Sequence, residues 1–344
     1  MRNDVSNQIN SLMDSVGALK TNPAMGNYLR SYWVAFVTTL SVTLCLTPVS
    51  RGFGQTVQAN QADLARNRAE LASAPNAYPG GVVEGHAVSS PNDSDLGEQA
   101  ILKRAEGYQP FTASVAAPFY WTSNVALVKT GEQSDFLVAP VAALAYQPRI
   151  TNALYGLVSV REQLFYYDRF SNLNFGTFDV VAGLAYTLPQ FHNLTLSGQY
   201  VYERLTTKNS FHEFFSNHSL VLSAELPIRL GRAQQFSLGA DANISFAAEP
   251  DPPQRSDYEI YLGYTARLSR SFSLDAVGRV VLRDYHLTDR LDVSEILAVS
   301  ANYSITRFLT ASAISTLAAS QSNHSVFDYQ VANVGGLVSL SIKF

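Results

Sequence analysis

The stretch that decides the fold is the last one, Asp328 to Phe344, which reads DYQVANVGGLVSLSIKF. From Ala332 onward, every second residue is apolar or glycine, and the residues between them are mostly small or polar. Successive side chains of a β-strand point to opposite faces, so this alternation predicts a strand with one apolar and one mostly polar face. The last strand of a soluble β-sandwich would show the same pattern, so the rest of the chain has to decide between a barrel and a sandwich.

Four further segments repeat the alternation without any helical spacing. From Leu194, Phe236, Tyr258 and Phe272 onward, apolar residues or glycines stand two apart, and a period of two is that of a half-buried strand. All such runs together predict about twelve strands, each with the ~9–11 residues, or slightly more, that a tilted membrane-crossing strand needs. The expected spans are 111–128, 135–146, 153–167, 176–188, 192–206, 217–228, 234–247, 256–268, 271–285, 292–305, 308–320 and 328–344.

The connections between these strands form two alternating series. One is short and often contains arginine, as at 229–233 and 269–270, and the other is on average longer and richer in acidic residues, as at 248–255 and 286–291. Outer-membrane barrels have short periplasmic turns and longer outer loops. With an even number of strands, both ends of the domain fall on the side of the short turns, which agrees with a periplasmic linker and a periplasmic C-terminus.

Three features favour a membrane barrel over a soluble sandwich. The apolar faces are rich in small residues, whereas a sandwich core needs bulk to pack at interior density. A closed barrel has no sheet edges, whose unpaired backbone groups lipid cannot satisfy. Aromatic residues also gather at the ends of the apolar faces, as girdles at headgroup depth do. They are Tyr186, Phe236, Phe272, Tyr303 and Phe344 at one end and Tyr202, Phe246 and Tyr258 at the other.

The predicted fold class is therefore all-β. We expect a closed antiparallel transmembrane β-barrel of about twelve strands over residues 110–344, with a mostly disordered N-terminal segment before it.

Residues 1–54 have the layout of a leader. Arg30 precedes an apolar run from Trp33 to Leu46, and Pro48 and small residues follow it, as in a secretory signal peptide. The run is shorter than the ~20 residues that a membrane-spanning helix needs. We expect cleavage near Gly54. Met25 is a possible true start, because the stretch before it is longer and more polar than is usual in a signal peptide.

Residues 55–109 form the second expected region. Gln58 to Ala72 contains good helix formers with only weak apolar periodicity, and Pro, Gly, Ser, Asn and Asp dominate from Ser73 onward. Such a stretch buries too little apolar surface to offset the entropy lost on ordering. We interpret it as a flexible periplasmic linker with one short helix. The alternative is that this helix plugs the barrel or docks a partner.

Composition and motifs argue against several functions. The net charge of -4 gives no reason to expect nucleic-acid binding, and the single cysteine, Cys45, excludes an intrachain disulfide. Two His–Ser pairs, His218–Ser219 and His324–Ser325, consist of adjacent residues, so in a strand their side chains point to opposite faces and cannot share a proton. The sequence has no metal-ligand spacing and no phosphate-binding glycine loop. We therefore predict no enzyme and no cofactor.

Inward-facing positions carry charges of both signs. A ring of one sign would select ions or charged sugars, but a mixed set is expected to pair largely across strands. Arg279 and Arg283 on one strand, with Arg161, are the candidates for a basic ladder. The candidate lumen-lining residues are Arg161, Asp179, Glu203, Glu225, Asp241, Glu259, Arg279 and Arg283.

The alternating final strand that ends on an aromatic residue resembles the closing strand of bacterial outer-membrane β-barrels. Over residues 111–344 the chain is similar to the porin-like members of this group, which include proteins associated with exopolysaccharide export. The resemblance implies that Phe344 is an assembly signal read by the barrel-assembly machinery, and that outer-membrane lipids surround the protein. It also implies passive passage of small polar solutes, saccharides or ions.

Two other functions stay open. One is a non-conducting structural or adhesion barrel. The other is an outer-membrane lipid hydrolase, whose family places its His and Ser two residues apart on the outward face of the barrel.

Overall fold

The computed structural model describes residues 57–72, 109–207, 212–231 and 233–344. The chain divides into a unit of residues 1–50 and a unit of residues 51–344, and all of the described structure belongs to the second. The expected leader, Cys45 and most of the expected linker lie outside the described residues.

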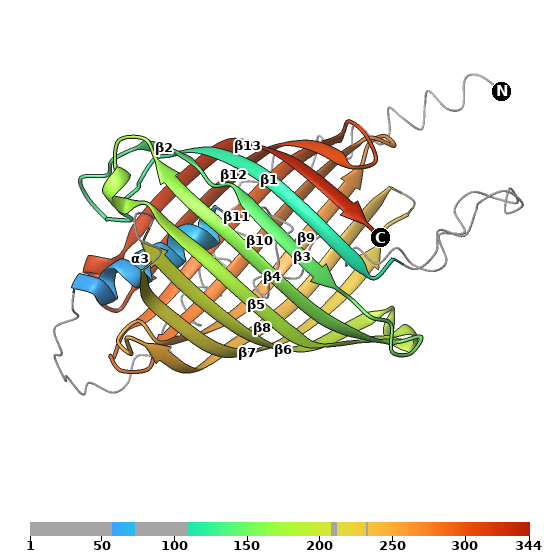
Figure 1. The fold of residues 1–344 in the computed structure, drawn as a ribbon, viewed down its shortest axis with the longest axis horizontal. Coiled ribbons are helices and arrows are strands. Elements are labelled where there is room, and N and C mark those ends of the chain that lie inside the picture. Colours follow the sequence, from blue (N-terminus) through green and yellow to red (C-terminus); the bar gives the residue numbers. More distant parts are fainter. Residues whose placement is uncertain (1–56, 73–108, 208–211, 232) are drawn as a thin grey trace, which may run out of the picture. The chain divides into compact units, whose positions relative to one another are not determined.

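Within the described residues, thirteen strands form one antiparallel sheet that closes on itself (Figure 1). Except for β2 and β3, strands that are consecutive in sequence pair with one another, and the last strand returns to pair with the first. They are β1 (Phe111–Thr122), β2 (Asp135–Val138), β3 (Val141–Tyr146), β4 (Leu154–Tyr167), β5 (Phe175–Leu188), β6 (Leu194–Thr207), β7 (Glu213–Arg229), β8 (Gln234–Glu249), β9 (Arg255–Arg267), β10 (Phe272–Tyr285), β11 (Leu291–Ser304), β12 (Leu309–Ser322) and β13 (Tyr329–Lys343).

The strands β2 and β3 share one position between β1 and β4, so the barrel has twelve positions and the predicted fold is confirmed. Ala139 and Pro140 separate the two pieces, because a proline has no N–H to give to a strand ladder. The wall nevertheless stays continuous. Ala139 N donates to Pro118 O at 2.9 Å, and Leu164 N donates to Pro140 O at 3.0 Å.

The first strand is shorter than expected and ends at Thr122 rather than at residue 128. Asn124 folds the chain back just after it. Its side-chain amide donates to Val128 O at 2.7 Å, and its side-chain oxygen accepts from Val128 N at 3.2 Å. An Asn side chain that replaces ladder bonds in this way favours a turn over a strand.

Aromatic rings and one glycine mark the seam where β1 meets β13. Phe111 and Phe344 exchange two backbone hydrogen bonds of 3.1 and 3.0 Å, and their rings stack with centroids 5.6 Å apart. The ring of Tyr146 also stacks on the ring of Phe111, with the ring centroids 4.5 Å apart. A Cβ at Gly335 would collide with the backbone oxygen of Phe119. The close approach of the two backbones therefore requires glycine at this position.

The outer face of the barrel is apolar. Large side chains such as Leu262 and Val338 are exposed along the strands, which matches the alternation in the sequence. Soluble monomers rarely expose an apolar surface of this extent, whereas a transmembrane barrel turns such a band to lipid. No helix among the described residues is long and apolar enough to cross a membrane.

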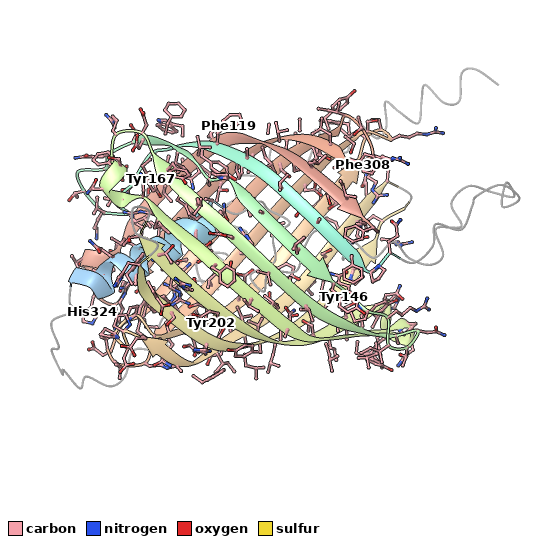
Figure 2. All side chains as sticks on the ribbon, viewed as in Figure 1. Phe119, Tyr146, Tyr167, Tyr202, Phe308 and His324 are labelled. Carbon is pink, nitrogen blue, oxygen red and sulfur yellow. The ribbon has the colours of Figure 1, made fainter. Side chains whose placement is uncertain are left out.

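Exposed aromatic residues lie at both ends of this apolar surface. Tyr146 and Phe308 lie near the end with the short turns, and Tyr202 lies towards the end with the long loops (Figure 2). Exposed members of the expected girdles are Tyr186, Tyr303 and Phe344 at the short-turn end and Phe246 and Tyr258 at the other. This arrangement places the apolar band between two aromatic belts.

The helix α3 (Val57–Leu71) lies inside the barrel near the long-loop end (Figure 1). Its alanines Ala62 and Ala65 belong to a buried cluster with Phe165 of β4 and Phe215 of β7. The sequence assigned this helix to a periplasmic linker, with a plug as the alternative, and the structure has it in the lumen. The face that packs on this cluster consists mostly of alanines, which is why the apolar periodicity of the helix is weak.

Candidate functional site

The side of α3 that faces the charged wall carries charges at helical spacing. Asp63, Arg66, Asn67 and Glu70 stand at positions i, i+3, i+4 and i+7, so they share one face. All four interact with side chains of the barrel wall. The helix therefore carries both signs of charge to the wall.

Asp63 is the most extensively bound of these residues. Its Oδ1 accepts hydrogen bonds from Arg255 Nη1 at 2.7 Å and from the Tyr285 hydroxyl at 2.7 Å, and its Oδ2 accepts one from Arg290 Nη1 at 2.9 Å. Burial alone would raise the pKa of Asp63, but the charges of Arg255 and Arg290 outweigh it and hold the pKa below its ordinary value. Asp63 is therefore an anion at neutral pH.

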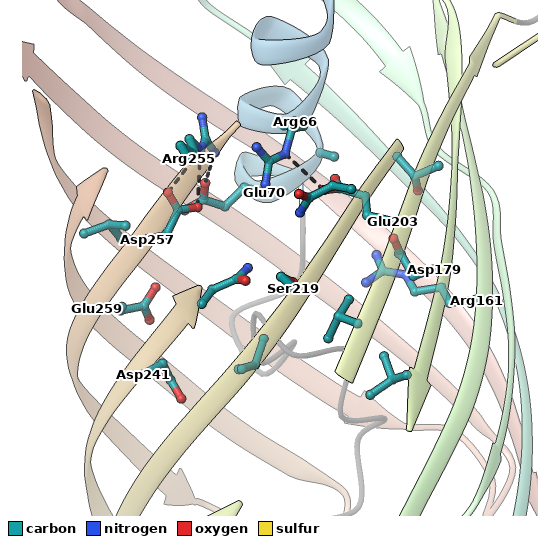
Figure 3. A pocket seen from close by; sticks show the side chains of 18 of the residues that line it. Arg66, Glu70, Arg161, Asp179, Glu203, Ser219, Asp241, Arg255, Asp257 and Glu259 are labelled. Atoms are coloured by element: carbon teal, nitrogen blue, oxygen red, sulfur yellow. Dashed lines mark hydrogen bonds and ion pairs between the residues drawn. The ribbon is translucent and has the colours of Figure 1, made fainter. Parts of the chain in front are cut away.

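Glu70 and Arg66 bind two different parts of the wall (Figure 3). Glu70 Oε2 accepts from Arg283 Nη2 at 2.7 Å and lies 4.0 Å from Arg255 Nη2. Arg66 Nε donates to Glu203 Oε2 on β6 at 3.0 Å. The helix thus gives two carboxylates to the arginines of β9 and β10 and one guanidinium to an acid of β6.

The C-terminal end of α3 is held by hydrogen bonds to its carbonyl groups. The last carbonyls of a helix have no partner within it. Here the Tyr120 hydroxyl donates to Ala72 O at 2.8 Å, and Asn333 Nδ2 donates to Leu71 O at 3.3 Å. The wall therefore caps the helix from β1 and β13, the two strands that form the seam.

A cavity of about 150 Å³ lies against the polar face of α3 (Figure 3). Water takes up ≈ 30 Å³ per molecule in the liquid, so this space suits a few waters or a small ion. Ligand pockets are usually ~300–1,000 Å³. The cavity beside α3 is therefore smaller than a usual pocket for a sugar-sized ligand.

Most of the candidate lumen residues meet at this cavity. Six of the eight line it: Arg161, Asp179, Glu203, Asp241, Glu259 and Arg279. Arg283 contacts Glu70 on α3 instead. Glu225 lies further towards the short turns, opposite Gly239 on β8.

The charges around the cavity are mixed and largely paired. Arg161 lies directly opposite Asp179 across the β4–β5 ladder, and Arg279 Nη1 is 3.8 Å from Glu259 Oε2. Two carboxylate pairs also face one another across strands, Asp179 with Glu203 and Asp241 with Glu259. Arg161 lies away from Arg255 on the other side of the cavity (Figure 3), so it does not extend a ladder with the arginines of β10.

Sequence reasoning missed the residues that hold the helix. The spacing of Asp63, Arg66 and Glu70 was visible as a charged helix face, but nothing in the sequence tied that face to the barrel. Arg255 was assigned to a loop, and it is the first residue of β9. Arg290 precedes β11 and turns into the lumen, where its guanidinium also lies over the ring of Tyr285.

The two His–Ser pairs form no catalytic pair. His218 lies on the outer face, where its Nδ1 is 2.7 Å from the Tyr200 hydroxyl, and Ser219 lines the cavity inside. Their opposite directions confirm the prediction from adjacency. His324 is exposed in a loop, 2.8 Å from Asp289 Oδ1. Among the described residues, no group of three or more His, Cys, Asp or Glu side chains is arranged to hold a metal ion.

Comparison with known proteins agrees with this architecture. Neither a protein-family model nor a curated protein sequence matches the chain. The structure of an outer membrane channel from Pseudomonas putida F1 is similar, with a TM-score of 0.50 and 12% identity over 68% of this chain and 96% of that one. The outer membrane channel DcaP of Acinetobacter baumannii gives 0.39 and 7% over 67% and 96%. Outer membrane phospholipase A from Escherichia coli gives 0.42 and 13% over 66% and 92%.

At this identity the likeness shows the fold alone. Closure of the sheet, the apolar outer face and the likeness to the first of these channels together define the class of protein. The chain has the fold of a porin-like β-barrel of the bacterial outer membrane, as the sequence predicted.

Proposed function

We propose that the protein is an outer-membrane channel for passive passage of small polar solutes, saccharides or ions, and that α3 closes it in the observed state. The observation that supports this most directly is how the helix is held. Ion pairs and hydrogen bonds bind its polar face to the wall, while its alanines and leucines pack in buried apolar clusters. The ion pairs and hydrogen bonds can be exchanged for water or for a charged solute.

The wall does not depend on the helix for its own closure. Every strand is paired on both sides by other strands, including the β1–β13 seam. Withdrawal of α3 would therefore leave a closed barrel whose inward side chains are largely polar. A twelve-position barrel is wider than the eight-stranded barrels whose interior is just filled by side chains.

Conductance in planar bilayers tests this proposal. The wild-type chain is compared with Asp63→Lys/Glu70→Lys, which puts two cations against Arg255 and Arg283 and so repels the helix from the wall. The matched control is Glu213→Lys, which breaks an exposed ion pair with Arg204 at 3.1 Å. We expect mostly closed wild-type and control channels and a current about tenfold larger for the double variant, since like charges buried together are strongly unfavourable.

The specific alternative is a non-conducting structural or adhesion barrel. The position of α3 inside the barrel, bound to the wall on several sides, is the observation that favours it. In that case the double variant, although folded and inserted, would carry no more current than the wild type. That result would contradict the channel proposal.

A further inference from the structure

We propose that the residues which grip the carboxylates of α3 form a binding site for an anionic solute, and that Asp63 and Glu70 occupy this site in place of the solute. The site consists of Arg255, Arg283 and Arg290 together with Tyr285, and we call it the arginine cluster. This inference rests on the proposed channel, and it names the chemical class of solute that would open it.

The arginine cluster is a built site. Each of its four side chains is at most 3% exposed. Their donors converge on two carboxylate groups of the helix, with three hydrogen bonds to Asp63 of 2.7 to 2.9 Å and one to Glu70 of 2.7 Å. Guanidinium groups that present several donors in fixed directions are the usual recognition elements for carboxylate and phosphate.

The wall alone does not neutralise this cluster. Arg255 has Asp257 as a wall partner, with Nε 3.0 Å from Oδ1, and Arg290 has Asp292, with Nε 3.0 Å from Oδ1. Arg283 donates to the hydroxyl of Ser294 and lies opposite the same two aspartates in the strand ladders, Asp257 on β9 and Asp292 on β11. Without α3, three guanidinium groups would face two carboxylates, and the Tyr285 hydroxyl would lose its acceptor.

An arginine in the lumen stays charged, and a buried charge that loses its partner is strongly unfavourable. When the helix leaves and water enters the lumen, the cluster keeps an excess of positive charge, which attracts an anion. The spacing of the helix carboxylates indicates its size. Asp63 Oδ1 and Glu70 Oε2 both reach the guanidinium of Arg255, at 2.7 Å from Nη1 and 4.0 Å from Nη2. The solute therefore has at least two carboxylate groups that are close enough to reach one guanidinium together.

Such a solute and α3 would compete for the same donors. A ligand that binds only after the helix has left shifts the equilibrium towards the helix-free state by the amount of its binding free energy. In the resting protein its apparent affinity is lowered by the small fraction of molecules in which the site is free. Weakening the helix contacts should therefore strengthen binding of the solute.

Binding measurements on the full chain in detergent test this inference. The probe is hexa-L-glutamate, a flexible peptide that presents a carboxylate on every residue, so that two of them can reach the arginine cluster together. Calorimetric titration compares the wild type with Asp63→Asn/Glu70→Gln, which keeps the side-chain shapes and removes both charges. We expect the double variant to bind hexaglutamate about tenfold more tightly than the wild type, since it frees the site more often.

Two controls identify the site. Hexa-L-glutamine, which has no carboxylate side chains, should not bind, and addition of Arg283→Gln to the double variant should weaken hexaglutamate binding about tenfold. Heat-modifiable mobility on gels verifies that each variant is a folded barrel. In the wild type, hexaglutamate should also speed tryptic cleavage after Arg66, which is buried while the helix is bound.

Equal affinity in the wild type and the double variant, or slower tryptic cleavage with hexaglutamate, would overturn the inference. Neither readout depends on current. A barrel that binds hexaglutamate in this way but never conducts would contradict the channel and leave the arginine cluster as an anion site. A barrel that conducts once α3 is repelled but does not bind hexaglutamate would support the channel and contradict the anion site.

Discussion

The two halves of the lumen satisfy their polar groups in different ways. Near the long loops, the charges of β6, β9 and β10 reach across to α3, as in the pairs Arg66–Glu203 and Arg283–Glu70. Near the short turns, polar side chains bond to their neighbours on the wall. The hydroxyl oxygens of Ser197 and Ser223 are hydrogen-bonded at 2.6 Å, and Asn302 Nδ2 donates to Asp275 Oδ2 at 2.6 Å.

This difference shows which part of the lumen can change. Hydrogen bonds along the wall join side chains of neighbouring strands, so they persist whether or not a helix is present. Ion pairs across the lumen exist only while α3 is bound. Since breaking a buried ion pair by loss of one partner costs about 3–5 kcal/mol, the long-loop half carries most of the energy that a displacement of the helix would change.

The largest effect is expected from a change that prevents closure of the barrel and so disrupts both halves of the lumen at once. In Gly335→Ala, the new Cβ would meet the backbone oxygen of Phe119 at the seam, and backbone atoms on both strands would have to move. We expect most of the protein not to reach the heat-modifiable folded form. Gly278→Ala on β10 is the matched control, because nothing lies within 4 Å of its Cβ. A normally folded Gly335→Ala variant would show that the seam is looser than the structure indicates.

The next effect concerns the long-loop half alone. Arg255→Met removes one of the two arginines that bind Asp63 and leaves Arg290 as the other, and we expect about 3 kcal/mol less favourable helix binding. That corresponds to roughly 100-fold more helix-free protein. The measurement is the rate of tryptic cleavage after Arg66 and Arg68. Asp275→Asn in the short-turn half is the control, and its cleavage rate should equal that of the wild type.

A pH titration sharpens the same contrast. The pKa of Asp63 lies below its ordinary value of 3.8, so its contribution to helix binding is fully present above that value and is lost as the pH falls through the lowered pKa. We expect hydrogen exchange of the α3 amides to reflect constant helix binding from pH 8 to 5 and weaker binding only below about pH 4. If the α3 amides lost their protection from hydrogen exchange near neutral pH, a group other than Asp63 would control binding of the helix to the wall.

The smallest effect is expected in the short-turn half. Ser197→Ala/Ser223→Ala removes one hydroxyl–hydroxyl bond of the wall and both of its partners, so we expect about 1 kcal/mol or less in the free energy of unfolding. Urea titration of the folded barrel measures it. Tryptic cleavage of α3 should be unchanged. An increase in cleavage would show that the two halves of the lumen are coupled.

The wall could be predicted almost completely because its signal is local. A period of two, short turns that alternate with long loops, and a final strand that ends on Phe344 located nearly every strand to within a few residues. The errors were local too. Pro140 split one strand, and Asn124 ended another early through bonds from its own side chain. Neither event is visible in an alternation pattern.

The helix and its site could not be predicted in the same way. Six of the eight charges assigned to the inward face from the alternation along the strands do line the cavity, because the alternation decides which face a side chain occupies. The alternation does not indicate which partner fills the space inside the barrel. Arg255 and Arg290 stand at a strand end and in a loop, where no periodicity applies.

The sequence by itself therefore determined the closed sheet, its apolar outer face and many of the charges that point inward from the strands, because each depends on side-chain direction along a strand. Only the tertiary structure decided how those charges are neutralised. Asp63 and Arg255 are 192 residues apart in the chain. They meet because the closed wall surrounds a lumen in which Arg255, Arg283 and Arg290 face two wall carboxylates, Asp257 and Asp292, and the carboxylates of α3 balance the remaining positive charge.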